Sequence, residues 1–260
     1  MAESDERDML VATLAEVGYE GFEETSDALH AFIPAEDFDK DALDAVANGI
    51  PYTLEDIEQR NWNAEWEAGI EPVVVEDFCT VRAHFHEPAS GTPYEVIITP
   101  KMSFGTGHHA TTRLVIGAMQ GIDFGGKRVL DFGTGTGVLA ILAAKLGATE
   151  LLGIDIDVWA VDNAIENAGR NDCSHIDMRL GILDDVDGRY DVILANINRH
   201  ILLAGMERMY GLLETGGTIV MSGLLTDDEQ IVVVNARAVG FTDEYVTTEN
   251  GWIAIKMLKR

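Results

Sequence analysis

Apolar runs alternate with amphipathic segments along the second half of the chain. The apolar runs lie at 128–132, 150–155, 177–180, 190–196 and 218–222, and the helical segments lie at 138–146, 158–171, 201–213 and 227–239. Residues Glu214 to Gly217 are expected to form a turn before the fifth run. Because strands buried on both faces are nearly continuously apolar, this alternation predicts an α/β fold with a doubly wound parallel sheet.

Two further apolar runs, at 241–247 and 252–257, close the sequence. They are joined by Glu249-Asn250-Gly251, which is too short for a parallel crossover, so an antiparallel hairpin at one edge of the sheet is predicted. Strands are also expected at 73–75, 78–85 and 95–99, with a turn at 88–91. The main domain is therefore predicted to span residues 73–260.

The first 57 residues are predicted to form a separate small α+β domain. Apolar residues recur at helical spacing up to Gly18, a hairpin is expected at 21–33 with its bend at Thr25-Ser26-Asp27, and a second short helix contains Leu43, Val46 and Ala47. This order resembles a ferredoxin-like module without its first strand. Residues 58–72 are predicted to be a linker containing a polar helix. Its Trp62 and Trp66 lie on one face and are expected to pack onto a neighbouring element, with stacking on a ligand as the alternative.

The charge of the chain is strongly negative. Its 260 residues include 45 Asp and Glu against 18 Lys and Arg, a formal net charge of -27. Such a chain is repelled by a phosphate backbone, so no direct nucleic-acid binding is expected. The same charge would attract a basic protein partner, although an acidic surface that only keeps the protein soluble is an equally good interpretation.

Cysteine usage and hydropathy indicate where the protein acts. Cys79 and Cys173 form no C-x-x-C pair, which gives no zinc signature and is typical of a reducing compartment. The apolar run 138–144 is stopped by Lys145, too early to span a bilayer. The acidic N-terminus does not match a signal peptide. A cytoplasmic location without a membrane partner is therefore expected.

The glycine-rich segment that follows the first apolar run of the main domain is a candidate cofactor site. Asp131 ends a strand, and Gly133, Gly135 and Gly137 follow at alternate positions before a helix. Glycines permit a sharp turn and a close approach to a ligand, and the helix directs free N–H groups toward it. A dinucleotide fingerprint needs a glycine where Val138 stands. The pattern D-x-G-x-G-x-G instead resembles the first motif of class I S-adenosylmethionine-dependent methyltransferases; a glycine-rich turn without a ligand is the plain alternative.

Three polar positions follow the next strands. Asp155 lies twenty residues after Gly135, where a carboxylate can accept both hydroxyls of an adenosine ribose in nicotinamide and methionine cofactors alike. Asp184, with Asp185 beside it, is interpreted either as a contact to the adenine amino group, as a helix cap or as a solvated side chain. Asn196 ends the fourth strand, where its amide could bind the methionine part of the cofactor and orient an incoming amine, or simply close the strand.

A loop before the helix that starts near residue 110 completes the candidate site. It contains Phe104, Gly105, Thr106 and Gly107, followed by the histidine pair 108–109 and the threonine pair 111–112. The two glycines would let the backbone fold over a ligand, and Thr111 or Thr112 is expected either to cap the helix or to donate a hydroxyl to the cofactor. Neighbouring histidines rarely converge on one ion, so no metal is expected.

Several motifs together resemble a specific family. They are F-G-T-G-H-H-A-T-T, V-L-D-F-G-T-G-T-G-V, G-I-D-I-D and I-L-A-N-I, supported by N-W-N-A-E-W and G-W-I-A-I. The segment from Asn61 to the C-terminus resembles the bacterial methyltransferases that modify ribosomal protein L11 of the large subunit, and the first sixty residues resemble them much less. His108 and Ala110 depart from the family, which usually has threonine and proline there.

The resemblance implies a class I methyltransferase (Rossmann-like) sheet preceded by a small domain that grips the ribosomal protein. It implies that S-adenosyl-L-methionine is the cofactor and is contacted by Thr112, Gly133, Asp155 and Asn196. The loop Phe104 to Gly107 would close over the methionine end. The basic ribosomal protein L11 would be the substrate.

The expected reaction moves a methyl group to lysine ε-amines and to an N-terminal α-amine. A lysine with a pKa of about 10.4 is neutral only about once in a thousand at pH 7, so burial and positioning of the amine are expected to matter more than a strong base. Asn196 is the predicted catalytic residue, holding the hydrogens of the amine together with nearby carbonyls. The alternatives are a methyltransferase for another protein or small-molecule amine, a nicotinamide-dependent oxidoreductase, and a non-catalytic binding protein.

Overall fold

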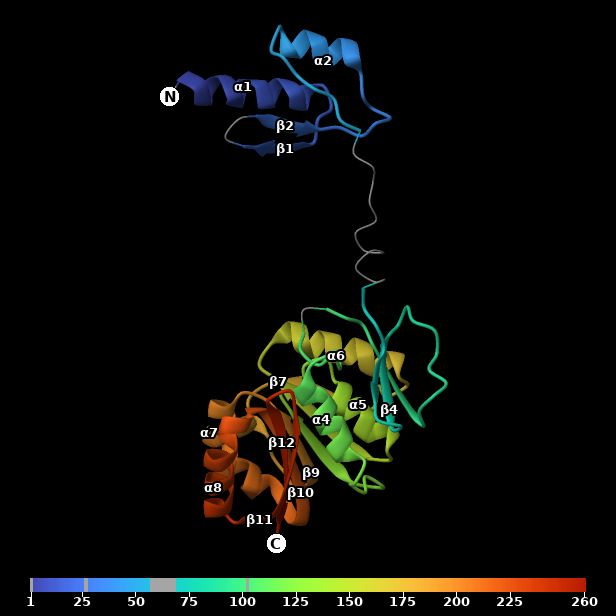
Figure 1. Cartoon of the computed structure of the whole chain (residues 1–260), viewed down its shortest axis with the longest axis vertical. Helices are drawn as coiled ribbons and strands as arrows, with labels where there is room; N and C mark the ends of the chain where they lie inside the picture. Colours follow the sequence, from blue (N-terminus) through green and yellow to red (C-terminus); the bar gives the residue numbers. More distant parts are fainter. Residues whose placement is uncertain (1, 26–27, 57–68, 102) are drawn as a thin grey trace. The chain divides into compact units, whose positions relative to one another are not determined.

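The computed structural model describes residues 2–25, 28–56, 69–101 and 103–260. The chain divides into two compact units, Met1–Trp62 and Asn63–Arg260 (Figure 1). The predicted helix with Trp62 and Trp66 lies outside the described residues, so it stays a prediction. No helix among the described residues combines the length and apolar character needed to cross a membrane.

The N-terminal unit contains two helices and one hairpin. Its elements are α1 (Ala2–Glu16), β1 (Gly21–Glu24), β2 (Leu29–Phe32) and α2 (Lys40–Ala47). The strands pair antiparallel, which confirms the predicted helix–hairpin–helix order, although α1 begins before the first periodic apolar residue. Asp39 caps α2 by accepting hydrogen bonds from the Asp41 and Ala42 amides. The small core is formed around Leu14, Tyr19 and Leu43.

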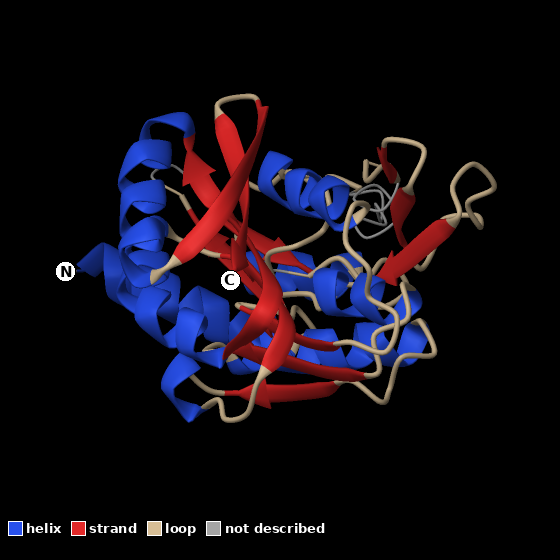
Figure 2. Ribbon diagram, turned by 90° about the horizontal axis from the view of Figure 1, so that it is seen from below, coloured by secondary structure: helices blue, strands red, loops and turns tan. Residues whose placement is uncertain are grey.

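The C-terminal unit is built on a seven-stranded sheet of order β11-β12-β10-β9-β6-β7-β8 (Figure 2). Strands β6 to β10 run parallel where they pair, whereas β12 is antiparallel to β10 and to β11. The doubly wound sheet and its edge hairpin are thus confirmed. The strands are β6 (Arg128–Phe132), β7 (Glu150–Asp155), β8 (Asp177–Leu180), β9 (Tyr190–Asn196), β10 (Leu213–Leu225), β11 (Phe241–Glu249) and β12 (Trp252–Lys259).

Alternating strand residues divide the core into two halves. Val129 and Leu151 belong to one cluster, and their neighbours Leu130 and Leu152 belong to the other. Because strand side chains alternate between faces, each apolar strand serves both clusters. Figure 1 places α4 and α5 on one side of the strands and α7 and α8 on the other. These helices, with α6 beside α5, are α4 (Ala110–Met119), α5 (Val138–Lys145), α6 (Val158–Arg170), α7 (Arg199–Leu212) and α8 (Glu229–Val239).

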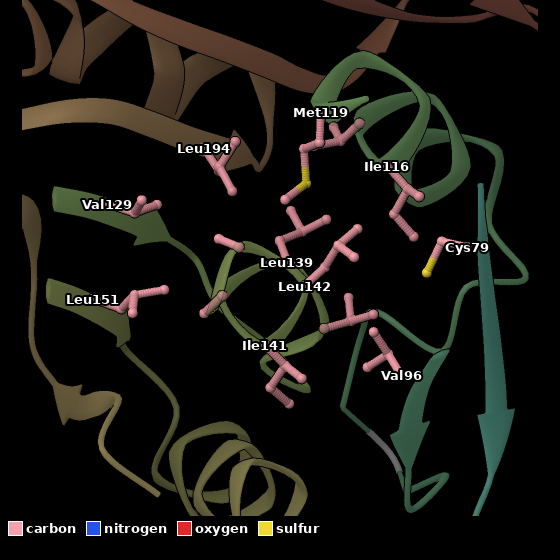
Figure 3. Packing of buried hydrophobic residues seen from close by; sticks show 14 of the residues in the cluster. Cys79, Val96, Ile116, Met119, Val129, Leu139, Ile141, Leu142, Leu151 and Leu194 are labelled. Atoms are coloured by element: carbon pink, nitrogen blue, oxygen red, sulfur yellow. The ribbon is translucent and has the colours of Figure 1, made fainter. Parts of the chain in front are cut away.

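A second, three-stranded sheet covers α5 from outside. It consists of β3 (Val73–Val75), β4 (Cys79–Ala83) and β5 (Tyr94–Ile98), in that order. In Figure 3, Leu139 and Leu142 of α5 lie between strand residues of the large sheet and the side chains of Cys79 and Val96. A helix enclosed by two sheets must be apolar all round, which accounts for the unbroken apolar run of α5.

One local expectation differs from the structure. Strands β4 and β5 pair in parallel, so the segment 88–91, predicted as a turn, lies within a crossover connection. The predicted turn Glu214 to Gly217 is wrong as a separate element because β10 already begins at Leu213, which pairs with Tyr190. Between Leu213 and Thr218 the register slips against β9, and Gly216 takes a left-handed φ of 83°. Glycine-rich sequence here produces a bulge inside a strand.

Candidate active site

The predicted site residues meet where β6, β7 and β9 end. Strand β6 lies between β7 and β9, so its carboxyl end is flanked by Asp155 on one side and Asn196 on the other. In open α/β sheets this edge is where ligands bind. Helix α4 brings Thr112 to the same place, with its Oγ1 3.5 Å from the Asn196 Nδ2.

The glycine-rich turn 133–137 is fixed by the sheet itself. The amides of Gly133 and Thr134 both donate to the Ile154 carbonyl at 2.9 Å. The Gly135 amide donates to Asp155 Oδ2, also at 2.9 Å. All three glycines have positive φ, and Gly137 is the N-cap residue of α5. The predicted tight strand-to-helix turn is confirmed.

The space above the turn is filled closely by the protein. A Cβ on Gly133 would lie 2.2 Å from a methyl of Ile197, and one on Gly135 would lie 2.3 Å from the Phe104 carbonyl oxygen. Both distances are far below van der Waals contact, and both glycines have positive φ. A side chain at either position would therefore strain the turn and displace Ile197 or the loop at Phe104.

Asp131 supports the turn from below. Its carboxyl is 1% exposed and its Oδ2 accepts hydrogen bonds from Thr134 Oγ1 at 2.7 Å and from the Ala140 amide at 3.2 Å. Burial raises the pKa of Asp131 to about 7, against the opposite effect of these two hydrogen bonds. Both donors belong to the turn and to α5, and neither observation tests a cofactor contact. The predicted contact between Asp131 and a cofactor therefore stays a prediction.

Asp155 both holds the turn and faces the site edge. Its Oδ1 accepts from the Asp157 amide at 3.1 Å, and the side chain is only partly buried, which leaves carboxylate lone pairs for ribose hydroxyls. Asp157 caps α6 by accepting from the Trp159 amide. Asp184 is exposed. The short helical turn at 183–185 is capped by its neighbour Asp185, which accepts a hydrogen bond from the Ile182 amide. The contact of Asp184 with adenine stays a prediction.

The loop from Phe104 to Gly107 docks on the glycine-rich turn. The Thr136 amide donates to the Phe104 carbonyl at 2.9 Å, and the Thr136 hydroxyl donates to the Gly105 carbonyl at 2.7 Å. Gly105 and Gly107 have φ values of 105° and 87°. Two segments predicted to contact the same cofactor therefore lie directly against each other, whereas the ring of Phe104 remains half exposed.

Helix α4 is capped by a histidine, and the prediction that Thr111 or Thr112 caps it is wrong. His109 Nδ1 accepts from the Thr111 amide at 3.3 Å, and both threonines are fully buried in the first turn of the helix. The His109 ring also packs 5.2 Å from the Phe104 ring and 4.6 Å from the Trp252 ring. The imidazole therefore combines two roles: it caps the helix, as a hydroxyl or carboxylate usually does, and it packs against two aromatic rings.

Both ring nitrogens of His108 contact oxygen atoms of the protein. Its Nε2 lies 2.9 Å from the Glu71 carbonyl, and its Nδ1 lies 3.2 Å from the Thr106 hydroxyl. Over the ranges that the structure describes, no group of three or more His, Cys, Asp or Glu side chains is placed to hold a metal ion.

Asn196 carries an unsatisfied acceptor. Its Oδ1 is buried and has no hydrogen-bond partner among the described residues, and its Nδ2 makes only the long contact to Thr112. A buried amide oxygen without a donor costs about 1–3 kcal/mol, so proteins rarely keep one without a reason. A ligand that brings an N–H group to this edge would satisfy it.

The sequence reasoning missed a row of asparagines on α6. Asn163 and Asn167 on α6, and Asn171 as its C-cap residue, are spaced by four residues and buried. The Asn171 amide exchanges hydrogen bonds with the backbone of Ile97, and Asn167 accepts from the Thr99 amide and donates to the Thr136 carbonyl. These side chains take the place of a neighbouring strand along β5 and connect it to the glycine-rich turn. Their four-residue spacing was the available signal.

Comparisons with known proteins show the family of this chain. The family model described as ribosomal protein L11 methyltransferase (PrmA) matches residues 5–260. A protein of that name from Porphyromonas gingivalis is 42% identical over 260 residues, covering 96% of this chain and 89% of its own. Another, from Chlorobaculum tepidum, is 36% identical and covers 97% and 92%.

A solved structure is also similar. The ribosomal protein L11 methylase from Lactobacillus delbrueckii subsp. bulgaricus superposes with a TM-score of 0.68 at 27% identity, covering 74% of this chain and all of that one. These matches lead to one assignment. The chain belongs to the ribosomal protein L11 methyltransferase family and is an S-adenosylmethionine-dependent class I methyltransferase.

Proposed function

We propose that this enzyme methylates ribosomal protein L11, at lysine ε-amines and at the N-terminal α-amine. The proposal is supported by relatives of that name that match nearly the whole chain. The observation that carries the catalytic part is the buried Asn196 Oδ1 at the carboxyl edge of β9, which has no hydrogen-bond partner in the described part of the chain.

The residues at this edge fit the cofactor. Asp155 would hold the ribose, Gly133 to Gly137 would lie under the methionine end, and Asn196 and Thr112 would hold its polar groups. The loop Phe104 to Gly107 would cover it, and Asp184 would reach the adenine. When bound, S-adenosylmethionine supplies a methyl group on a positively charged sulfur.

Asn196 would act by orientation rather than by taking up a proton. An amide oxygen accepts a hydrogen bond from an amine but is not basic at neutral pH. Held in this way, the amine keeps its lone pair free for attack. Removal from water lowers the pKa of a lysine amine, which raises the neutral fraction that can react. Proximity then supplies the rest of the rate enhancement.

The charge of the chain favours a basic protein as substrate. The first 62 residues contain 17 of the 45 acidic residues and only 3 of the 18 basic ones. A surface of this sign accelerates encounter with a positively charged protein and disfavours contact with nucleic acid. We therefore assign recognition of the ribosomal protein to the N-terminal unit. Because the proposed substrate is a ribosomal protein, we also propose that the reaction takes place in the cytoplasm.

Mass spectrometry of purified L11 after incubation with isotope-labelled S-adenosylmethionine tests the proposal. Labelled methyl groups on lysines and on the N-terminus are expected, and other basic ribosomal proteins in the same assay should remain unlabelled. Equal labelling of the other proteins, or of a small amine, would assign the enzyme to another substrate.

Asn196→Ala tests the catalytic assignment in the same assay. Turnover at saturating cofactor should fall about a hundredfold, because one positioned hydrogen bond at a reacting group is worth about 3 kcal/mol. Asn235→Ala is the matched control, since Asn235 lies exposed on α8 and bonds only within that helix. Normal turnover of Asn196→Ala would remove this residue from the reaction.

A further inference from the structure

We propose that Arg113 and Glu249 form a clamp that positions the loop 103–109, which makes the C-terminal hairpin part of the active site. The inference rests on the proposed placement of this loop over the cofactor. Neither residue is among the predicted cofactor contacts, and both are charged side chains with most of their surface buried. They are positioning residues.

Arg113 joins three elements with one side chain. It lies on α4. Its Nε donates to Glu249 Oε1 at 2.9 Å, and its Nη2 donates to the same oxygen. Its Nη1 donates to the His108 carbonyl and lies 3.4 Å from the Gly107 carbonyl. A planar guanidinium can serve a carboxylate on one side and main-chain oxygens on another, which the single ammonium of a lysine cannot do in the same geometry.

Glu249 places the other end of the clamp on the hairpin. It is the last residue of β11, directly before the tight turn at Asn250 and Gly251, whose φ values are 50° and 81°. Trp252, the first residue of β12, packs its ring against His109. The tip of the hairpin therefore supports the end of the loop in two ways: indirectly, through the ion pair of Glu249 with Arg113, and directly, through the edge contact of Trp252 with His109.

The loop needs such a clamp because its backbone is intrinsically loose. Gly105 and Gly107 both have positive φ, and glycine loses more conformational entropy on ordering than any other residue. Thr136 fixes the beginning of the loop at the Phe104 and Gly105 carbonyls. Arg113 fixes its end at the Gly107 and His108 carbonyls. A loop held at both ends is preorganised, and preorganisation improves affinity for whatever the loop covers.

Glu249→Gln removes the charge of the clamp with little change in shape. Without cofactor, amide hydrogen exchange in a peptide covering 103–109 should become about tenfold faster. The Kd for S-adenosylmethionine, measured by calorimetry, should rise about tenfold. The matched control is Glu244→Gln, which breaks another ion pair of β11, with Arg237 of α8 at 2.7 Å, away from the loop. This control should change neither quantity.

The outcomes separate the clamp from the proposed function. Unchanged exchange in Glu249→Gln would overturn the clamp whatever the enzyme methylates. Faster exchange with an unchanged Kd would show that the loop does not cover the cofactor, which overturns both the loop placement and the positioning role. Neither result would affect labelling of L11 by the wild-type enzyme.

Exchanging the two charges gives a sharper test. The double variant Arg113→Glu with Glu249→Arg restores an ion pair but removes the donors to the two loop carbonyls. The Kd should therefore stay as weak as in Glu249→Gln. Recovery to the wild-type Kd would mean that the ion pair alone matters, and would contradict the bridging role of Arg113.

Discussion

Two glycine-containing segments meet at the active site, and they are held in different ways. The turn 133–137 is fixed by main-chain hydrogen bonds to the neighbouring strand β7, through the Ile154 carbonyl. The loop 103–109 pairs with no strand among the described residues. It is held by one main-chain bond, from the Thr136 amide to the Phe104 carbonyl, and by the side chains of Thr136 and Arg113. The first segment takes its shape from the sheet, whereas the second depends on a few hydrogen bonds from Thr136 and Arg113.

This difference predicts different responses to mutation. A defect in the turn acts directly on the backbone that lies under the cofactor. A defect in an anchor of the loop leaves the sheet intact and only loosens a cover. Four substitutions test this comparison, and their expected effects on cofactor binding decrease from Gly135 through Asp155 and Thr136 to Asp131.

Gly135→Ala should have the largest effect. A Cβ there would lie 2.3 Å from the Phe104 carbonyl, and the φ of 55° is unfavourable for alanine. Displacement of the loop and strain in the turn together cost about 3 kcal/mol. The Kd for S-adenosylmethionine should therefore rise at least about a hundredfold in calorimetry.

Gly126→Ala separates the clash from the strain. Gly126 also has a positive φ, of 68°, but a Cβ on this residue would have no other atom within 4 Å. This variant should lose some stability and keep its cofactor affinity. If both variants bind the cofactor like the wild type, the close approach of the loop to the turn has no role in binding.

Asp155→Ala should have the second largest effect. Charge-assisted hydrogen bonds to the ribose are worth about 1.5–3 kcal/mol, and the Gly135 amide also loses its acceptor. We expect the Kd to rise about fiftyfold in calorimetry. Asp155→Asn, which keeps an acceptor for Gly135, should retain the thermal stability that Asp155→Ala loses. An unchanged Kd in both would remove Asp155 from the ribose site.

The same comparison explains how far the sequence could be interpreted. Strands β6, β7, β8 and β9 agree with their predicted residues, because a buried parallel strand needs an apolar run and a following turn signal. The turn 133–137 was predictable for the same reason, since its geometry depends on its own glycines. Prediction was accurate where structure is local.

The anchors of the loop were not predictable in this way. Arg113 meets Glu249 across 136 positions of sequence, and nothing in either local pattern indicates the contact. The local pattern suggests Thr111 or Thr112 as the cap of α4, whereas the packing of Trp252 against the imidazole gives that role to His109. The segment Glu214 to Gly217 has the sequence of a turn but forms a bulge inside β10. This difference arises from pairing with β9, a tertiary contact that the local sequence does not reveal.

Thr136→Val should have a moderate effect that is confined to the loop. Valine keeps the shape of threonine but leaves the Gly105 carbonyl without its donor, a loss of about 1–2 kcal/mol at a buried site. The Kd should rise about tenfold, and hydrogen exchange should increase in the loop 103–109 but not in β6. Thr149→Val, at an exposed position, serves as the control. Equal exchange in the loop and the strand would contradict the separate anchoring of the two segments.

Asp131→Asn should have the smallest effect on binding and a distinct effect on stability. The pKa of the buried carboxyl is raised to about 7, whereas an unfolded Asp titrates near pH 4. Between these values the folded protein holds one more proton than the unfolded chain, so Asp131 lowers the free energy of unfolding as pH rises, by up to about 1.4 kcal/mol per pH unit. Above pH 7 this contribution becomes constant.

Asparagine cannot titrate, and its amide oxygen can still accept from Thr134 and Ala140. Urea unfolding followed by tryptophan fluorescence from pH 5 to 8 should therefore show the wild type losing stability relative to Asp131→Asn as pH rises toward 7. The Kd for cofactor at pH 7 should change less than about threefold. Parallel stability profiles would mean that Asp131 is ionised in the folded protein. In that case the support beneath the turn would be an ion held by two hydrogen bonds, and the turn would be no more sensitive to pH than the loop.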